Sequence, residues 1–114
     1  MNNKPVVLIF ADYYIPGFKA GGPIKSIQSI CDGLSLYSNI YLITRDRDIK
    51  SMEPYKEVST NTWLKVGNVN VMYKVEREVS LSFIKEIFHS IQPSVIHLNS
   101  LMSIRFSFLP LLAA

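Results

Sequence analysis

The sequence predicts an α/β fold with an open, mostly parallel, Rossmann-like sheet and helices on both of its faces. Short, continuous apolar runs recur along the chain, as is typical of strands buried on both faces. The segments between several of these runs carry apolar residues at helical spacing. Strands that alternate with helices favour parallel pairing, because a parallel connection needs a crossover of about a dozen residues or more.

The composition fits one small globular domain. Of 114 residues, 48% are hydrophobic and 18% are charged, which is enough for a core and too few charges for a disordered tail. The net charge of +3 is spread along the chain, so we expect no nucleic-acid partner. The single cysteine, Cys31, lies on the apolar face of a predicted helix and favours a cytoplasmic location. The first apolar run is too short for a signal peptide or a membrane span.

The first half of the chain predicts a strand, a helix and a strand. Residues 6–11 form an apolar, β-branched run that suits a buried strand. Pro23 is suited to the first turn of a helix over residues 23–36. The apolar face of that helix consists of Ile24, Ile27, Ile30, Cys31 and Leu34. Residues 39–44 form a second short apolar strand.

The second half is less regular at its start. Residues 45–68 read as a long loop with a short element near Trp63, and residues 69–75 return to strand spacing. Ser80 or Ser82 can cap a helix that Gln92-Pro93 stops, and residues 95–98 predict a fourth, buried strand. The apolar segment 103–114 lacks a closing signal. We therefore expect residues 1–114 to be an incomplete N-terminal domain, and segment 103–114 to be a core helix without its partners.

A glycine-rich loop, DYYIPGFKAGGPIKS at residues 12–26, follows the first strand. Backbone N–H groups at such a strand-to-helix junction can bind an anion. The dinucleotide pattern G-x-G-x-x-G fails, because Gly17, Gly21 and Gly22 are spaced G-x-x-x-G-G. The phosphate-binding pattern G-x-x-x-x-G-K-[ST] also fails, because two residues separate Gly22 from Lys25.

Residues 12–23 carry the pattern D-x-Y-x-P-G-x-x-x-G-G-P, which resembles the N-terminal signature of family 4 glycosyltransferases of the GT-B fold. The resemblance continues through residues 44–48, 61–63 and 93–100. It implies retaining, metal-independent transfer of a sugar from a nucleotide-sugar donor to a glycan or lipid-linked acceptor, with no cofactor. The reaction would take place in a cleft between two Rossmann-like domains. The resemblance also implies bacterial polysaccharide biosynthesis, with the full enzyme peripherally associated with the inner face of the membrane.

The resemblance assigns roles to several residues but identifies no catalytic one. Gly21 and Gly22 would lie against the donor diphosphate and the acceptor, where their amides stabilise negative charge. The candidate acceptor contacts are Asp12, Tyr14, Lys19, Arg45, His97 and Asn99. Many family members end the fourth strand in H-x-H-G, whereas this chain has Asn99 at the second histidine, and an amide cannot take a proton. The donor-binding C-terminal domain is absent, so the chain alone should not catalyse transfer.

Simpler interpretations stand beside these. The glycine pair can serve as a turn, His97 as a structural histidine and Trp63 as a packing anchor. The run Arg45 to Asp48 reads as a solvated loop, although Arg45 directly follows a strand and can face the cleft. Two functions remain open. The chain is either the N-terminal domain of a glycosyltransferase or a non-catalytic Rossmann-like binding or interaction module.

Overall fold

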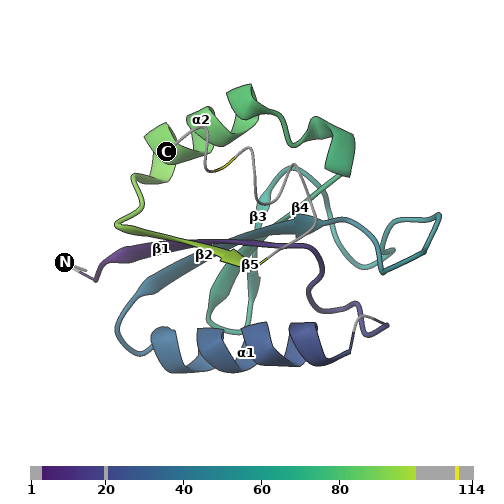
Figure 1. Cartoon of the computed structure of the whole chain (residues 1–114), viewed down its shortest axis with the longest axis horizontal. Helices are drawn as coiled ribbons and strands as arrows, with labels where there is room; N and C mark the ends of the chain where they lie inside the picture. Colours follow the sequence, from purple (N-terminus) through teal and green to yellow (C-terminus); the bar gives the residue numbers. More distant parts are fainter. Residues whose placement is uncertain (1–3, 20, 100–109, 111–114) are drawn as a thin grey trace.

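The sheet lies between two helices. The computed structural model describes residues 4–19, 21–99 and 110. Within these residues, helix α1 (Gly22–Leu34) covers one face of a five-stranded sheet and helix α2 (Leu81–Ile91) covers the other, as Figure 1 shows. The strands are β1 (Val6–Ala11), β2 (Asn39–Arg45), β3 (Trp63–Val66), β4 (Val69–Lys74) and β5 (Val95–Asn99), and a 3-10 turn, η1, spans Glu76–Glu78.

The strand order is β3-β4-β2-β1-β5. Pairing is parallel between β1 and β2, between β1 and β5 and between β2 and β4, and only the β3–β4 pair is antiparallel. The predicted α/β fold with a mostly parallel sheet is therefore confirmed. The chain moves outward from β1 to β2 and β4 and then returns to the other side of β1 with β5. The carboxyl ends of the four parallel strands consequently lie side by side at one end of the sheet, on the right in Figure 1. We call this end of the sheet the carboxyl edge.

Each face of the sheet has its own core. Under α1, buried residues of β1, β2 and β4, with Tyr73 among them, pack on the helix together with Tyr14 of the loop after β1. Under α2, the core is purely apolar: Leu8, Phe10, Ile43, Met72, Val79, Ile84 and Ile87. Because β1, β2 and β4 are covered on both faces, most of their residues are apolar, as is typical of parallel strands.

The helix ends follow local sequence signals. Gly21, with φ +68°, precedes α1, and Pro23 lies in its first turn, where a missing N–H costs nothing. The Ser80 side chain accepts a hydrogen bond from the Phe83 N–H (3.1 Å), so Ser80 is the cap of α2. Gln92 ends α2 in the left-handed conformation (φ 47°) just before Pro93.

One sequence prediction is made more specific, one needs correction, and one lies outside the described residues. The element near Trp63 is strand β3, joined to β4 by a tight turn in which Gly67 has φ +62°. Strand β5 is less buried than its composition predicts, because it is an edge of the described sheet and Val95 is 54% exposed. The predicted helix over 103–114 falls outside the described residues, apart from Pro110. No helix in the described part is long and apolar enough to cross a membrane.

Candidate functional site at the carboxyl edge of the sheet

The glycine loop is fastened to the loop that follows β2 by one carboxylate. Asp48 accepts hydrogen bonds from the backbone N–H groups of Phe18 (3.0 Å), Lys19 (3.2 Å to each oxygen) and Ile49 (2.8 Å). Burial alone would raise the pKa of Asp48, but these amides and the charge of Lys19 outweigh it and hold the pKa below its ordinary value. Asp48 is therefore ionised and joins segments that are 30 residues apart in sequence.

Two tyrosines hold the same loop from the side of the sheet. The Tyr73 hydroxyl, from β4, donates to the Ile15 carbonyl, and the Tyr55 hydroxyl donates to the Tyr14 carbonyl (3.4 Å). The Tyr55 and Tyr73 rings also pack edge to face, 5.9 Å apart. Burial raises the pKa of Tyr73 to about 12, so its hydroxyl stays protonated and able to donate at neutral pH.

The three glycines of the loop have different roles. A Cβ on Gly17 would collide with the Tyr55 hydroxyl and lie 3.0 Å from the Tyr14 carbonyl oxygen, so a side chain there requires Tyr55 or the loop to move. Gly21 needs its left-handed φ, and its N–H donates to the Phe18 carbonyl (3.0 Å). Gly22 is exposed, with open space where a Cβ would stand. Since Gly21 uses its N–H within the loop and Pro23 has none, the start of α1 offers an anion fewer donors than the sequence suggests.

Arg45, at the end of β2, joins three segments at the carboxyl edge. Its guanidinium donates to the Tyr13 hydroxyl (2.8 Å) and stacks over the Tyr13 ring at 5.1 Å. It also lies 3.3 Å from a carboxylate oxygen of Asp12, after β1, and 3.0 Å from one of Glu76, after β4. Arg45 therefore faces the carboxyl edge. Its ion pair with Asp12 brings these two predicted site residues together.

The run that follows Arg45 is not the solvated loop that the sequence suggests. Asp46 is 2% exposed and Asp48 is 8% exposed. Asp46 accepts hydrogen bonds from Nε (2.8 Å) and Nη2 (3.3 Å) of Arg47, which also donates to the Met52 carbonyl (2.9 Å). These acids are buried because guanidinium and amide donors replace their water. The contacts of Asp48 with Phe18 and Lys19 span about 30 residues, so local sequence does not indicate them.

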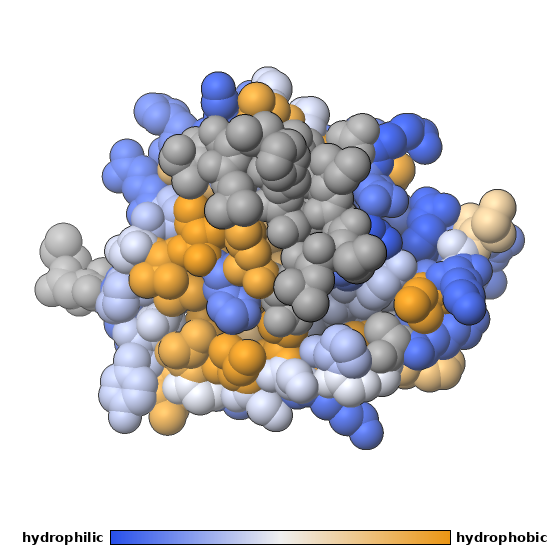
Figure 2. Space-filling model, viewed as in Figure 1, coloured by the Kyte–Doolittle hydropathy of each residue, from blue (hydrophilic) through white to orange (hydrophobic). Residues whose placement is uncertain are grey.

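A pocket of about 350 Å³ opens beside Arg45. It is lined by Tyr13, Arg45, Asp46, Arg47, Asp48, Lys50, Ser51, Val75, Glu76 and Arg77. Its walls thus come from the segments that follow β1, β2 and β4. Hydrophilic residues predominate at this end of the molecule, whereas apolar residues gather around β5, as Figure 2 shows.

Other predicted site residues lie apart from the pocket walls. Tyr14 is 2% exposed within the core beneath α1 and shares a hydrogen bond with Cys31, so its side chain is out of reach of a ligand. The neighbouring Tyr13, which sequence reasoning passed over, lines the pocket instead. Burial raises the pKa of Cys31 to about 11, so it remains a thiol at neutral pH.

The remaining candidates lie around the same edge. Lys19 has an exposed side chain, and its backbone N–H is bound to Asp48. His97 is half-buried on β5 opposite Ile9, and Asn99 is opposite Ala11 at the end of that strand. Roles for Gly21, Gly22, Lys19, His97 and Asn99 in binding donor or acceptor stay predictions.

Comparison with known protein families, with curated proteins and with solved structures finds no match to this chain. Within the described residues, no group of three or more histidine, cysteine, aspartate and glutamate side chains is placed to hold a metal ion.

Proposed function

We propose that the chain is the acceptor-side, N-terminal domain of a retaining glycosyltransferase of the GT-B fold. It would help to transfer a sugar from a nucleotide-sugar donor to a glycan or lipid-linked acceptor. The main support is that segments 12–19 and 45–48, which carry the resemblance separately in the sequence, are bonded to each other through Asp48 and Arg45. This assembly lies at the carboxyl edge of the sheet, which is where ligands bind in open α/β folds.

The chemistry of the pocket suits a sugar. Hydroxyl groups of a sugar need both donors and acceptors, and the pocket walls offer guanidinium groups, carboxylates and the Tyr13 phenol. Its volume of about 350 Å³ is near the lower end of the usual range for ligand pockets. A single sugar unit suits that space better than a whole nucleotide sugar, which favours an acceptor over a donor.

The buried polar atoms of the described residues that lack a hydrogen-bond partner include two at or near the carboxyl end of β1 and β2. These two are Oδ1 of Asp12, whose contact with Arg45 is an ion pair only, and the hydroxyl of Thr44. Buried polar groups in native proteins are almost always satisfied, and the exceptions need a reason. Contact with a ligand or a second domain at this edge would supply that reason.

The test is a glycosyl-transfer assay on the protein purified at its natural length. Nucleotide sugars and lipid-linked or soluble glycans are supplied, and the anomeric configuration of the product is read by NMR. We expect retention of configuration. We also expect Arg45→Met to lower kcat/KM for the acceptor about tenfold, since it removes the hydrogen bond that positions Tyr13 in the pocket wall, whereas Lys65→Met, at an exposed position, has no effect.

A different result would favour the other function. If the natural-length protein binds glycans but neither transfers nor hydrolyses any donor sugar, the chain is a non-catalytic binding module.

A further inference from the structure

Most charges around the pocket are already matched within the protein. The single positive charge of Arg45 is paired with two carboxylates, Asp12 and Glu76, and Arg47 forms a bidentate ion pair with Asp46. The charge of Asp48 is satisfied by backbone N–H groups of the two loops that it joins. These side chains build the walls of the pocket and have little capacity left to attract a charged ligand.

Two cations on the pocket wall are not matched in this way. Lys50 and Arg77 both line the pocket, both are exposed, and neither forms an ion pair with a carboxylate of the described residues. Lys50 follows Asp48 in a turn closed by the hydrogen bond from the Ser51 N–H to the Asp48 carbonyl (3.1 Å). Arg77 lies in η1, just after β4. The two side chains therefore reach the pocket from different segments.

The backbone at Lys50 supports a specific role. Lys50 has φ +59°, in the left-handed region that a non-glycine residue adopts at some cost. The turn holds it there because Asp48 and Ser51 are bonded on either side.

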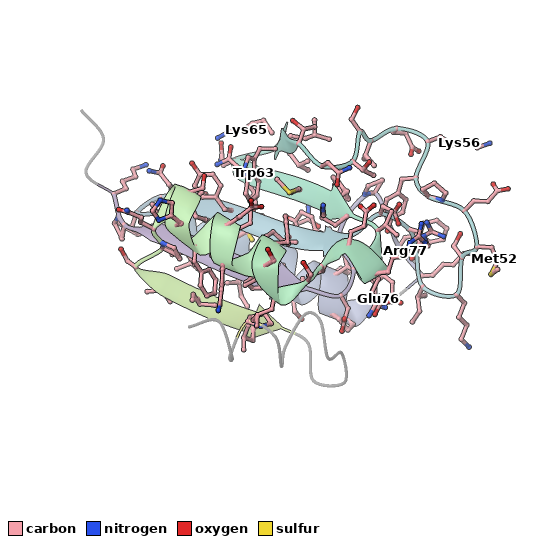
Figure 3. All side chains as sticks on the ribbon, turned by 90° about the horizontal axis from the view of Figure 1, so that it is seen from above. Met52, Lys56, Trp63, Lys65, Glu76 and Arg77 are labelled. Atoms are coloured by element: carbon pink, nitrogen blue, oxygen red, sulfur yellow. The ribbon has the colours of Figure 1, made fainter. Side chains whose placement is uncertain are left out.

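Figure 3 shows Glu76 and Arg77 at the same end of the molecule as Met52, whereas Lys65 lies toward the opposite end and Lys56 points away from Arg77.

We propose that Lys50 and Arg77 bind the anionic group of a phosphate- or carboxylate-bearing monosaccharide in this pocket. A guanidinium forms paired hydrogen bonds with either anion, and an ammonium adds a mobile donor beside it. The sugar ring then lies toward Tyr13, whose hydroxyl accepts a hydrogen bond from Arg45 and keeps its own proton to donate to a sugar hydroxyl. The inference rests on the proposed function only in that it makes this charged sugar the acceptor.

The experiment is calorimetric titration of the protein, purified at its natural length, with a hexose 1-phosphate, a hexuronate, the neutral hexose and inorganic phosphate. We expect one of the charged sugars to bind at least about tenfold more tightly than the hexose, because its anion gains charge-assisted hydrogen bonds. The phosphate sugar and the uronate are separate arms, so the tighter of the two identifies the anion.

Matched variants then locate the binding. The double variant Lys50→Gln/Arg77→Gln should weaken binding of the charged sugar at least about tenfold and leave that of the hexose unchanged. Lys56→Gln/Lys65→Gln removes the same charge from exposed positions that do not line the pocket and should change binding less than about twofold. All four positions are exposed, so the melting temperature without ligand should not change.

Three results would overturn the inference. They are equal affinity for the hexose and the charged sugars, equal loss in both double variants, and binding of inorganic phosphate as tight as that of the hexose phosphate. Failure of the proposed function is recognised separately. Charged-sugar binding that depends on Lys50 and Arg77, in a protein that transfers no sugar, refutes the transferase and keeps the site. Sugar transfer whose rate does not depend on the charge of the acceptor supports the transferase and refutes the charged-sugar site.

Discussion

Residues 12–19 of the glycine loop are held from two sides, whereas Gly21 and Gly22 at its end have open space where side chains would stand. The held part is bonded to Asp48 in the loop after β2 and to Tyr73 in β4. The open part carries the positive φ of Gly21 and the start of α1. The glycine-rich loop therefore has two parts: residues 12–19 are fixed by contacts with other segments, and Gly21 and Gly22 form an accessible junction with α1.

This division decides which residues a ligand can meet. The held part positions Tyr13 and Asp12 against Arg45, and this contact forms one wall of the pocket. The open part can approach a ligand only through the exposed backbone at Gly22. Substitutions in the held part should therefore change stability strongly, whereas those in the open part should change it little.

Replacing Asp48 should have the largest effect. Asp48→Ala leaves three backbone N–H groups of buried or partly buried segments without their acceptor, and we expect a loss of about 3 kcal/mol in the free energy of unfolding. Urea denaturation measures it. Asp32→Ala, at an exposed position of α1, is the control and should cost less than about 0.5 kcal/mol. If the two variants unfold alike, the loop is not held by Asp48.

Gly17→Ala should have the next largest effect. The new methyl group would collide with Tyr55 and the Tyr14 carbonyl, so the loop or the tyrosine must move. Overpacking of this kind typically costs about 2 kcal/mol. The fall in melting temperature measures it. A variant as stable as the wild type would show that the Tyr55 contact can relax without cost.

Acid should weaken the held part through Asp48. Because the pKa of this carboxyl is lower in the folded chain than its ordinary value of 3.8, its ionisation stabilises the fold above that value. This stabilisation is lost as the pH falls through the lower, folded pKa. Unfolding free energies of the wild type and Asp48→Asn, measured from pH 6 downward, should show a shallower acid loss in the variant. Parallel curves would contradict the assignment.

Gly22→Ala should have the smallest effect, and of opposite sign. An alanine at the start of α1 meets no atom within 4 Å apart from its chain neighbours, and it restricts the unfolded chain. We expect a gain of about 0.5 kcal/mol. Thermal denaturation beside Gly17→Ala compares the two parts of the loop directly. A loss of stability in Gly22→Ala would show that the open part is also held.

Local signals account for most of the fold. The apolar run of β1, the spacing in α1 and the Ser80 cap of α2 each specify their element within a few residues. Strand β3 was harder to predict, because its four residues follow a polar segment and it depends on pairing with β4. The Gly67-Asn68 turn was the signal that could have identified it.

The site was predictable only in part. The glycine loop and Arg45 follow strand ends, which marks them in the sequence. Asp48 and Tyr73 act on residues 30 and 58 positions away, and the alternating charges at 45–48 give no sign of burial. Tyr13 and Tyr14 are adjacent, and only the fold decides which of them is buried.

The most direct test of the central claim, that the carboxyl edge binds a sugar, is an NMR titration of the isotopically labelled chain with hexose 1-phosphate and hexuronate. The account predicts that backbone amide shifts concentrate at Tyr13, Lys50, Ser51, Glu76 and Arg77, while Lys56 and Lys65 stay unchanged. Shifts confined to other parts of the chain, or none with either sugar at millimolar concentration, would contradict it.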